Sequence, residues 1–85
     1  MNVKLVYFAW VRERVGRAQE EAELPPQLAT IADLLGWLKA RGEGYAEAFA
    51  NERVVRAAID HVHAKPGTAL AGAREIAFFP PMTGG

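Results

Sequence analysis

In TIADLLGWLKARG (residues 30–42), apolar side chains recur at the spacing of an amphipathic helix. Thr30 and Asp33 have the spacing of a capping box, and Gly42 is a natural C-terminal stop. Four residues at positions i, i+3, i+4 and i+7 form the apolar face: Ile31, Leu34, Leu35 and Leu38. The pattern predicts a core helix, and we assign no chemistry to it.

Short runs rich in β-branched and aromatic residues predict strands on either side of this helix. The first is residues 3–8, and an acidic run at 18–24 is expected to pair with it as a solvated edge strand. Residues 54–59 and 75–79 are two further strands, and a very short strand containing His63 follows a turn at residues 60–61.

The remaining segments are short. Residues 9–15 have helical spacing and end at Gly16, and residues 42–51 form either a turn of helix or an ordered loop. One main helix covering one face of a mixed sheet of about five strands is an α+β domain. The β-grasp fold places the last strand beside the first, but element order alone does not choose it over other small α+β folds.

The length and composition of the chain indicate which classes of protein it can belong to. The chain has 85 residues, which suits a single domain, here residues 1–79 with an extended tail at 80–85. Ten basic and ten acidic residues balance, which argues against nucleic acid as the main partner. There is no cysteine, no apolar run long enough for a membrane span and no signal-peptide pattern, so we expect a soluble cytoplasmic protein.

The C-terminal stretch is FFPPMTGG, residues 78–85. Pro80 and Pro81 cannot continue a sheet ladder, so the last strand must end at Phe79. Residues 80–85 can then extend as an arm of at most roughly 20 Å. Gly84 and Gly85 lack side chains and can pass through a narrow channel.

Such an arm suits chemistry at the terminal carboxylate of Gly85. Joining that carboxylate to AMP makes a mixed anhydride, which sulfur converts to a thiocarboxylate and an amine converts to an amide. The alternative is an inert terminus, since chain ends are often small and frayed.

Three stretches carry a family resemblance that covers the whole chain. They are VKLVYFA with the following VRE and VG in residues 3–16, TIADLL at 30–35, and IAFFPPMTGG at 76–85. Together they resemble the small subunit of molybdopterin synthase, the MoaD family. FFPP followed by two residues and GG is the most specific of these motifs, whereas GG alone is shared by all ubiquitin-like carriers.

The resemblance implies a ubiquitin-like β-grasp sulfur carrier with no bound cofactor. A partner would adenylate Gly85 with ATP, and the terminus would become a thiocarboxylate. The tail would enter the large synthase subunit and donate sulfur to cyclic pyranopterin monophosphate, in an assembly of two small and two large subunits. Family members often have Asn at the position of Asp60, and residues 60–66 also depart from the usual pattern.

Two other readings stay open. The chain could be another ubiquitin-like carrier, such as a thiamin-type sulfur carrier or a protein modifier. It could also be a β-grasp interaction module with an inert tail. The FFPP lead-in favours the synthase subunit over the other carriers.

Strand parity predicts a binding surface for the partner. If Leu5, Tyr7, Ile76 and Phe78 face the helix, then Phe8 and Phe79 face outward beside the tail, unless the short helix or a loop covers them. Arg12 could bind a carboxylate of the partner or be an ordinary surface arginine. The full set of residues expected to contact the partner is Phe8, Arg12, Phe79, Pro80, Pro81, Met82 and Thr83.

Other polar groups are expected to have no catalytic role. His61 and His63 could lie on one side of a strand, but no third metal ligand is evident, and we expect no metal site. A group of glutamates is expected to be solvated surface rather than acid–base machinery: Glu13, Glu20, Glu21 and Glu23. Catalytic groups would therefore come from the partners, with this chain as the sulfur-donating cosubstrate.

Overall fold

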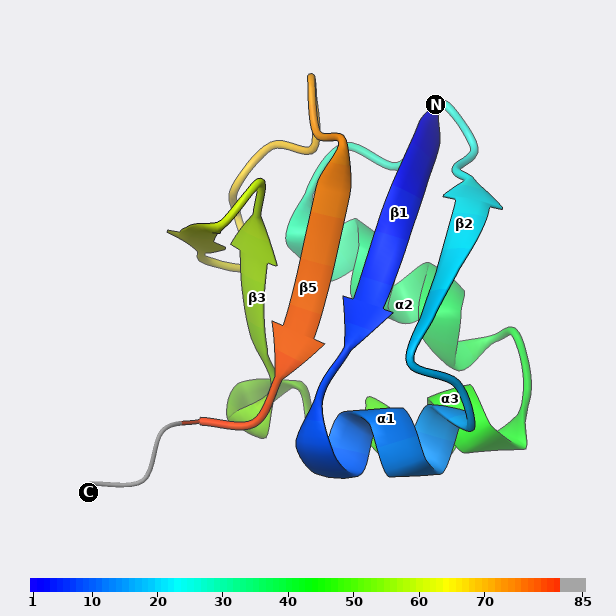
Figure 1. Ribbon diagram of the computed structural model, residues 1–85. Coiled ribbons are helices and arrows are strands. Elements are labelled where there is room, and N and C mark those ends of the chain that lie inside the picture. The colour runs from blue at the N-terminus through cyan, green and yellow to red at the C-terminus, as the bar shows by residue number, and fades with distance from the viewer. Residues whose placement is uncertain (82–85) are drawn as a thin grey trace.

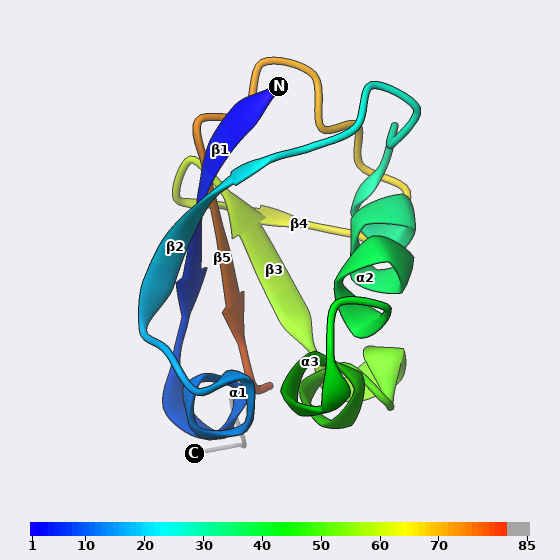
Figure 2. The same cartoon turned by 90° about the vertical axis from the view of Figure 1, so that its right-hand side faces the viewer.

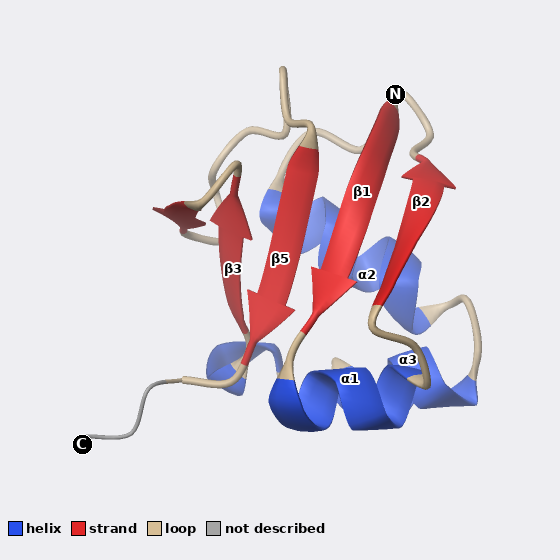
Figure 3. Ribbon diagram, viewed as in Figure 1, coloured by secondary structure: helices blue, strands red, loops and turns tan. Residues whose placement is uncertain are grey.

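The computed structural model describes residues 1–81. Its elements are β1 (Asn2–Tyr7), α1 (Ala9–Val15), β2 (Gln19–Glu23), α2 (Ile31–Lys39), α3 (Glu43–Ala48), η1 (Glu52–Val54), β3 (Arg56–Ile59), β4 (Val62–Ala64) and β5 (Glu75–Phe79). The strands form one sheet in the order β2-β1-β5-β3-β4 (Figures 1 and 3). β1 and β5 run parallel at its centre, and the other pairs are antiparallel.

Helix α2 packs on one face of the sheet, and α1 and α3 lie at the end where β1 and β5 finish (Figure 2). Within residues 1–81, no helix covers the opposite face. This is the expected α+β β-grasp architecture, and the expected neighbourhood of first and last strands is confirmed. Within residues 1–81, no helix is long and apolar enough to cross a membrane.

The core joins the inward residues of the central strands to the helices. Leu5, Ile76 and Phe78 are fully buried, as are Leu34 and Leu38 of α2. Alternate residues of each strand supply this inner layer, as the period of two requires. Strand parity therefore placed the inner face correctly.

The capping box of α2 forms as its spacing predicts. The Asp33 amide donates to Thr30 Oγ1 at 3.2 Å, and Asp33 Oδ2 accepts from the amides of Ala29 and Thr30 at 3.0 and 3.1 Å. These two backbone N–H groups hold the pKa of the Asp33 carboxyl below its usual value. The helix ends at Lys39 rather than reaching Gly42.

Residues 43–48 form a helix rather than an ordered loop. Ala48 and Phe49 are buried, and the Phe49 ring lies edge-on to Phe78 with centroids 5.2 Å apart. This contact anchors the C-terminal end of α3 to the last strand. The chain then makes a short 3-10 turn, so the third strand starts at Arg56, and Val54 is exposed instead of belonging to it.

Glu20 was expected to be a solvated surface residue, and the structure corrects this expectation. Its side chain is only 6% exposed, and Oε2 accepts hydrogen bonds from the hydroxyls of Tyr7 and Tyr45 at 2.7 and 2.6 Å. Oε1 lies 3.2 Å from Arg41 Nη1 and 3.4 Å from Arg17 Nη1. Glu20 is therefore a structural tie between β1, β2 and α3 and not solvated surface.

The Glu20 contacts shift three pKa values. Burial acts to raise the pKa of Glu20, but the two tyrosine hydroxyls and the arginines outweigh it, so this pKa lies below its usual value. Burial and the bond to Glu20 raise the pKa of both Tyr7 and Tyr45. The folded protein thus favours a charged carboxylate held by neutral phenols.

Candidate docking face and tail root

The tail begins where β5 ends at Phe79. Pro80 and Pro81 follow directly, and Figure 1 shows the chain leaving the sheet at the end where β1 passes into α1. The expected strand end at Phe79 is confirmed. Met82, Thr83, Gly84 and Gly85 lie outside the described residues, so the expectations for them stay predictions.

The face of the sheet without helices carries an apolar row. Register places Val6 beside Ala77, Ala77 beside Ala58, and Ala58 beside His63. These side chains alternate with the buried inner layer, so they point to the open face. We call this surface, completed by Phe8 and Phe79, the docking face.

Phe8 is the most accessible large apolar side chain of the docking face. It is 50% exposed, although its amide is anchored to the Phe78 carbonyl at 3.0 Å. Phe79 is half-buried. The outward orientation expected for Phe8 is thus matched by its exposure, and the short helix α1 does not cover it.

A backbone turn places Phe8 at this position. Ala9 has φ of +52°, a left-handed conformation that costs a non-glycine residue roughly 1–2 kcal/mol. The turn directs the chain from β1 into α1, whose first turn is held by the Val11 and Arg12 amides donating to the Phe8 carbonyl at 3.1 and 3.3 Å. Arg12 is exposed on α1, which follows the end of β1 directly. Phe8, Arg12 and Phe79 therefore all lie at the tail end of the sheet.

Two residues at the tail root were not expected from the sequence. The His63 ring contacts the Phe79 ring, with centroids 6.2 Å apart and planes at 67°. Arg56 is the cross-strand partner of Phe79. The alternation of residues in β3 and β4 could have placed Arg56 and His63 beside Phe79 only if the pairing register of the strands had been known.

The two histidines do not converge. His61 lies in the turn with φ of +72°, and its Nε2 is 3.7 Å from Glu75 Oε2, whereas His63 contacts Phe79. The expectation that both imidazoles lie on one side of a strand is wrong, because the turn takes up His61. Among residues 1–81, no three His, Asp or Glu side chains gather as metal ligands would.

The Asp60 carboxylate fixes the position of the two-residue turn between β3 and β4. Asp60 and His61 both have positive φ, the backbone of a type I′ hairpin turn. Asp60 Oδ1 accepts from the amides of Arg74 and Glu75 at 3.1 and 2.9 Å. The turn is thereby fastened to the start of β5 at the end of the sheet away from the tail.

The site therefore consists of the apolar docking face, the exposed ring of Phe8 and the first residues of the arm that ends in two glycines. Within residues 1–81, it contains no paired acid and base at the tail root. The arrangement is suited to docking on another protein and delivering the arm into it.

Comparison with known proteins agrees with this architecture. The ThiS family profile matches residues 5–85. The chain is 31% identical over 83 residues to the molybdopterin synthase sulfur carrier subunit of Escherichia coli (strain K12), covering 98% of this chain and 99% of that protein.

Solved structures show the same fold. A candidate molybdopterin converting factor subunit 1 from Pyrococcus furiosus is 26% identical, with a TM-score of 0.72, over 96% of this chain and 99% of that chain. SAMP1 from Haloferax volcanii is 23% identical, with a TM-score of 0.71 over the whole of both chains. This chain belongs to the ThiS family and has the ubiquitin-like β-grasp fold.

Proposed function

We propose that this chain is the sulfur-donating small subunit of a molybdopterin synthase, with its sulfur carried at Gly85. The observation that carries the proposal is the exposed Phe8 beside Phe79 at the root of the FFPPMTGG arm. Whole-chain similarity to a protein named as a molybdopterin synthase sulfur carrier subunit supports it. The docking face binds the large subunit, and the arm reaches that subunit's active site.

The chemistry proceeds at the terminal carboxyl group. An ATP-dependent partner transfers AMP to a carboxylate oxygen of Gly85 and releases pyrophosphate. A hydrosulfide ion from a sulfur source then attacks the carbonyl carbon, AMP leaves with the bridging oxygen, and loss of the sulfur-bound proton gives the thiocarboxylate. The sulfur is passed to cyclic pyranopterin monophosphate, and hydrolysis returns the Gly85 carboxylate.

In these reaction steps, the role of residues 1–81 is to bind the partner proteins. An exposed aromatic ring in an apolar face is the usual composition of an interface hot spot. Pro80 and Pro81 fix φ and favour an extended course, so less conformational entropy is lost when the arm is inserted. Acid, base and cation groups are supplied by the partners.

The test is an intact-mass measurement on chain purified from its native host without reducing or alkylating steps. The expected species has one oxygen replaced by sulfur, localised to Gly85. Incubation of that species with the large subunit and cyclic pyranopterin monophosphate should consume the thiocarboxylate and form molybdopterin.

Each failure has a distinct meaning. A thiocarboxylate that is consumed only with a thiamin-type acceptor would replace the synthase role with another sulfur-transfer role. Amide-linked conjugates without thiocarboxylate would make the chain a protein modifier. If only the free carboxylate is found after incubation with ATP, a sulfur source and host extract, the carrier chemistry is wrong for this chain.

A further inference from the structure

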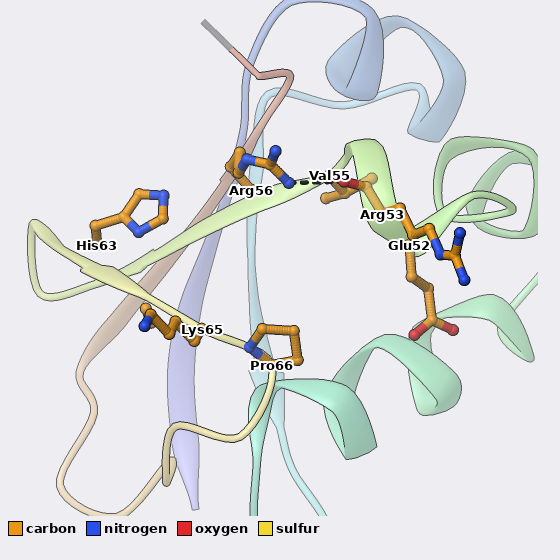
Figure 4. Close-up of a pocket in the computed structure, with 8 residues that line it drawn as sticks. Glu52, Arg53, Val55, Arg56, His63, Lys65 and Pro66 are labelled. Carbon is orange, nitrogen blue, oxygen red and sulfur yellow. Dashed lines mark hydrogen bonds between the residues drawn. The ribbon is translucent and has the colours of Figure 1, made fainter.

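A groove with a volume of about 330 Å³ lies next to the tail root, on the β3–β4 side of β5. Its walls come from η1, the start of β3, β4 and the turn that follows β4. Figure 4 shows Arg56 and Val55 along one side and Lys65 and Pro66 along the other. Val55 and Ala64 are both 7% exposed and give the groove an apolar floor.

The charges around this groove are predominantly positive. Arg53, Arg56 and Lys65 line it, and Glu52 is the one carboxylate among its lining residues. That carboxylate is neutralised from outside, because Lys39 Nζ lies 2.6 Å from Glu52 Oε2. Within residues 1–81, none of the three lining cations has a carboxylate oxygen within 4.0 Å.

Arg56 is held in position at the groove. Its Nη1 donates to the Arg53 carbonyl at 2.7 Å, and the dashed line in Figure 4 marks this bond. A guanidinium has five N–H donors, so the others stay available for an acceptor in the groove. A fixed guanidinium binds a carboxylate with less loss of side-chain entropy than a mobile one.

The groove continues the docking face. Arg56 lies directly across from Phe79, and His63, which lines the groove, contacts the Phe79 ring. A segment seated in the groove would therefore run alongside the root of the arm. The groove belongs to the surface that a docked protein would cover.

We propose that this groove binds an acidic segment of a protein partner, with carboxylates on Arg56 and Lys65 and an apolar side chain on the floor formed by Val55 and Ala64. A single inorganic phosphate would fill only part of the volume and leave the apolar floor unused. Nucleic acid is disfavoured by the zero net charge of the chain. The proposal does not depend on the chemistry at Gly85.

The test uses the full ¹⁵N-labelled chain and a blocked peptide of sequence Glu-Asp-Leu-Glu-Asp, titrated at low ionic strength. Amide shifts should concentrate in residues 53–56 and 63–65. The isosteric peptide Gln-Asn-Leu-Gln-Asn should cause no comparable shifts. Added salt should weaken binding of the acidic peptide, because exposed charges are screened over about 10 Å at 0.1 M.

Charge-neutralising variants localise the effect. Arg56→Gln and Lys65→Gln should each weaken peptide binding by about fivefold, as expected when one of two charge contacts is lost. Arg74→Gln is the matched control, because Arg74 is an exposed arginine at the opposite end of β5. Thermal unfolding of each variant verifies that the fold is retained, and Arg56→Lys should restore part of the affinity.

Three outcomes would overturn the proposal. The first is equal binding of the neutral peptide, and the second is an equal loss in Arg74→Gln. The third concerns the chain's own tail. If a chain lacking residues 82–85 shows shifted 53–56 amides without peptide and binds the peptide more tightly, the tail itself is the occupant of the groove.

Discussion

The Tyr7 hydroxyl donates a 2.7 Å hydrogen bond to Glu20 Oε2, which links a central strand of the sheet to its acidic edge strand. Tyr45 of α3 donates to the same oxygen at 2.6 Å. The Tyr7 ring also stacks on Phe78 of β5, with centroids 6.1 Å apart. One phenol therefore contacts the edge strand by its hydroxyl and the last strand by its ring.

Replacing this carboxylate should lower stability. Glu20→Gln keeps an acceptor oxygen for the tyrosines but loses the charge that strengthens both bonds and attracts Arg41. We expect a loss of about 1–2 kcal/mol in the free energy of unfolding, measured by urea denaturation. Glu21→Gln, on the exposed neighbour, should change it by less than about 0.5 kcal/mol. Equal effects of the two variants would contradict the role given to Glu20.

The same cluster predicts the pH dependence of stability. Because the pKa of folded Glu20 lies below its usual value of 4.5, its contribution is fully present above pH 4.5 and is lost as the pH falls below it. The raised pKa values of Tyr7 and Tyr45 contribute stability below pH 10.0 that is lost as the pH rises above it. Denaturation midpoints across this range should fall at both ends. In Glu20→Gln the acid decline should be shallower, and an unchanged acid arm would refute the assignment.

Two helical glycines should respond oppositely to alanine. A Cβ on Gly44 would clash with the Arg14 carbonyl oxygen, so α1 and α3 would have to separate. A Cβ on Gly36, in α2, would meet no atom within 4 Å. Gly36→Ala should therefore stabilise by about 0.5–1 kcal/mol, whereas Gly44→Ala should destabilise by about 1–3 kcal/mol. Thermal unfolding of the pair is the measurement, and stabilisation by Gly44→Ala would show that the helices tolerate the extra methyl group.

Phe8→Glu should weaken binding to the large synthase subunit. A carboxylate would replace the exposed phenyl ring of the docking face. Loss of a hot-spot aromatic typically costs 2 kcal/mol or more, about 30-fold in Kd. Calorimetry with the purified large subunit measures this change. Val62→Glu is the control, because Val62 is 69% exposed on β4 and outside the docking face. Unchanged affinity in Phe8→Glu would remove the docking face from the interface.

Deleting Gly85 should abolish ATP-dependent thiolation while leaving the denaturation midpoint unchanged. A chain extended by one alanine beyond Gly85 should also fail, since its terminal carboxylate would be displaced and carry a side chain next to it. Intact-mass spectrometry after incubation with the activating partner reads out both variants. Thiolation of either one would separate the sulfur chemistry from the Gly-Gly terminus.

Periodicity identified the elements that bury one clear face. The four apolar residues of α2 and the inward residues of β1 and β5 repeat at unmistakable spacing, so the sheet and its covering helix were predictable. Helix α3 was not, because six residues that include Gly44 and follow Gly42 carry little periodic signal. Its stability comes from Phe49 packing on Tyr7 and Phe78, which are distant in sequence.

The candidate site was predictable only in part. The alternation of side chains along a strand placed Phe8 and Phe79 on the open face, because this inference needs only the sequence of each strand and not its pairing partners. Glu20 looked like one of several surface glutamates, since its partners Tyr7 and Tyr45 lie 13 and 25 residues away. Arg56 and His63 reach the tail root through the register of β3, β4 and β5, which the turn at Asp60 sets.

The parallel pairing of β1 with β5 also bears on biosynthesis. The two strands lie at opposite ends of the chain, so the centre of the sheet cannot close until the last segment has been made. Contacts this distant in sequence form late and slowly. Phe8 on the first segment and Phe79 on the last share one surface only after that closure. An activating partner that recognises this surface would therefore bind only chains in which β5 has already paired with β1.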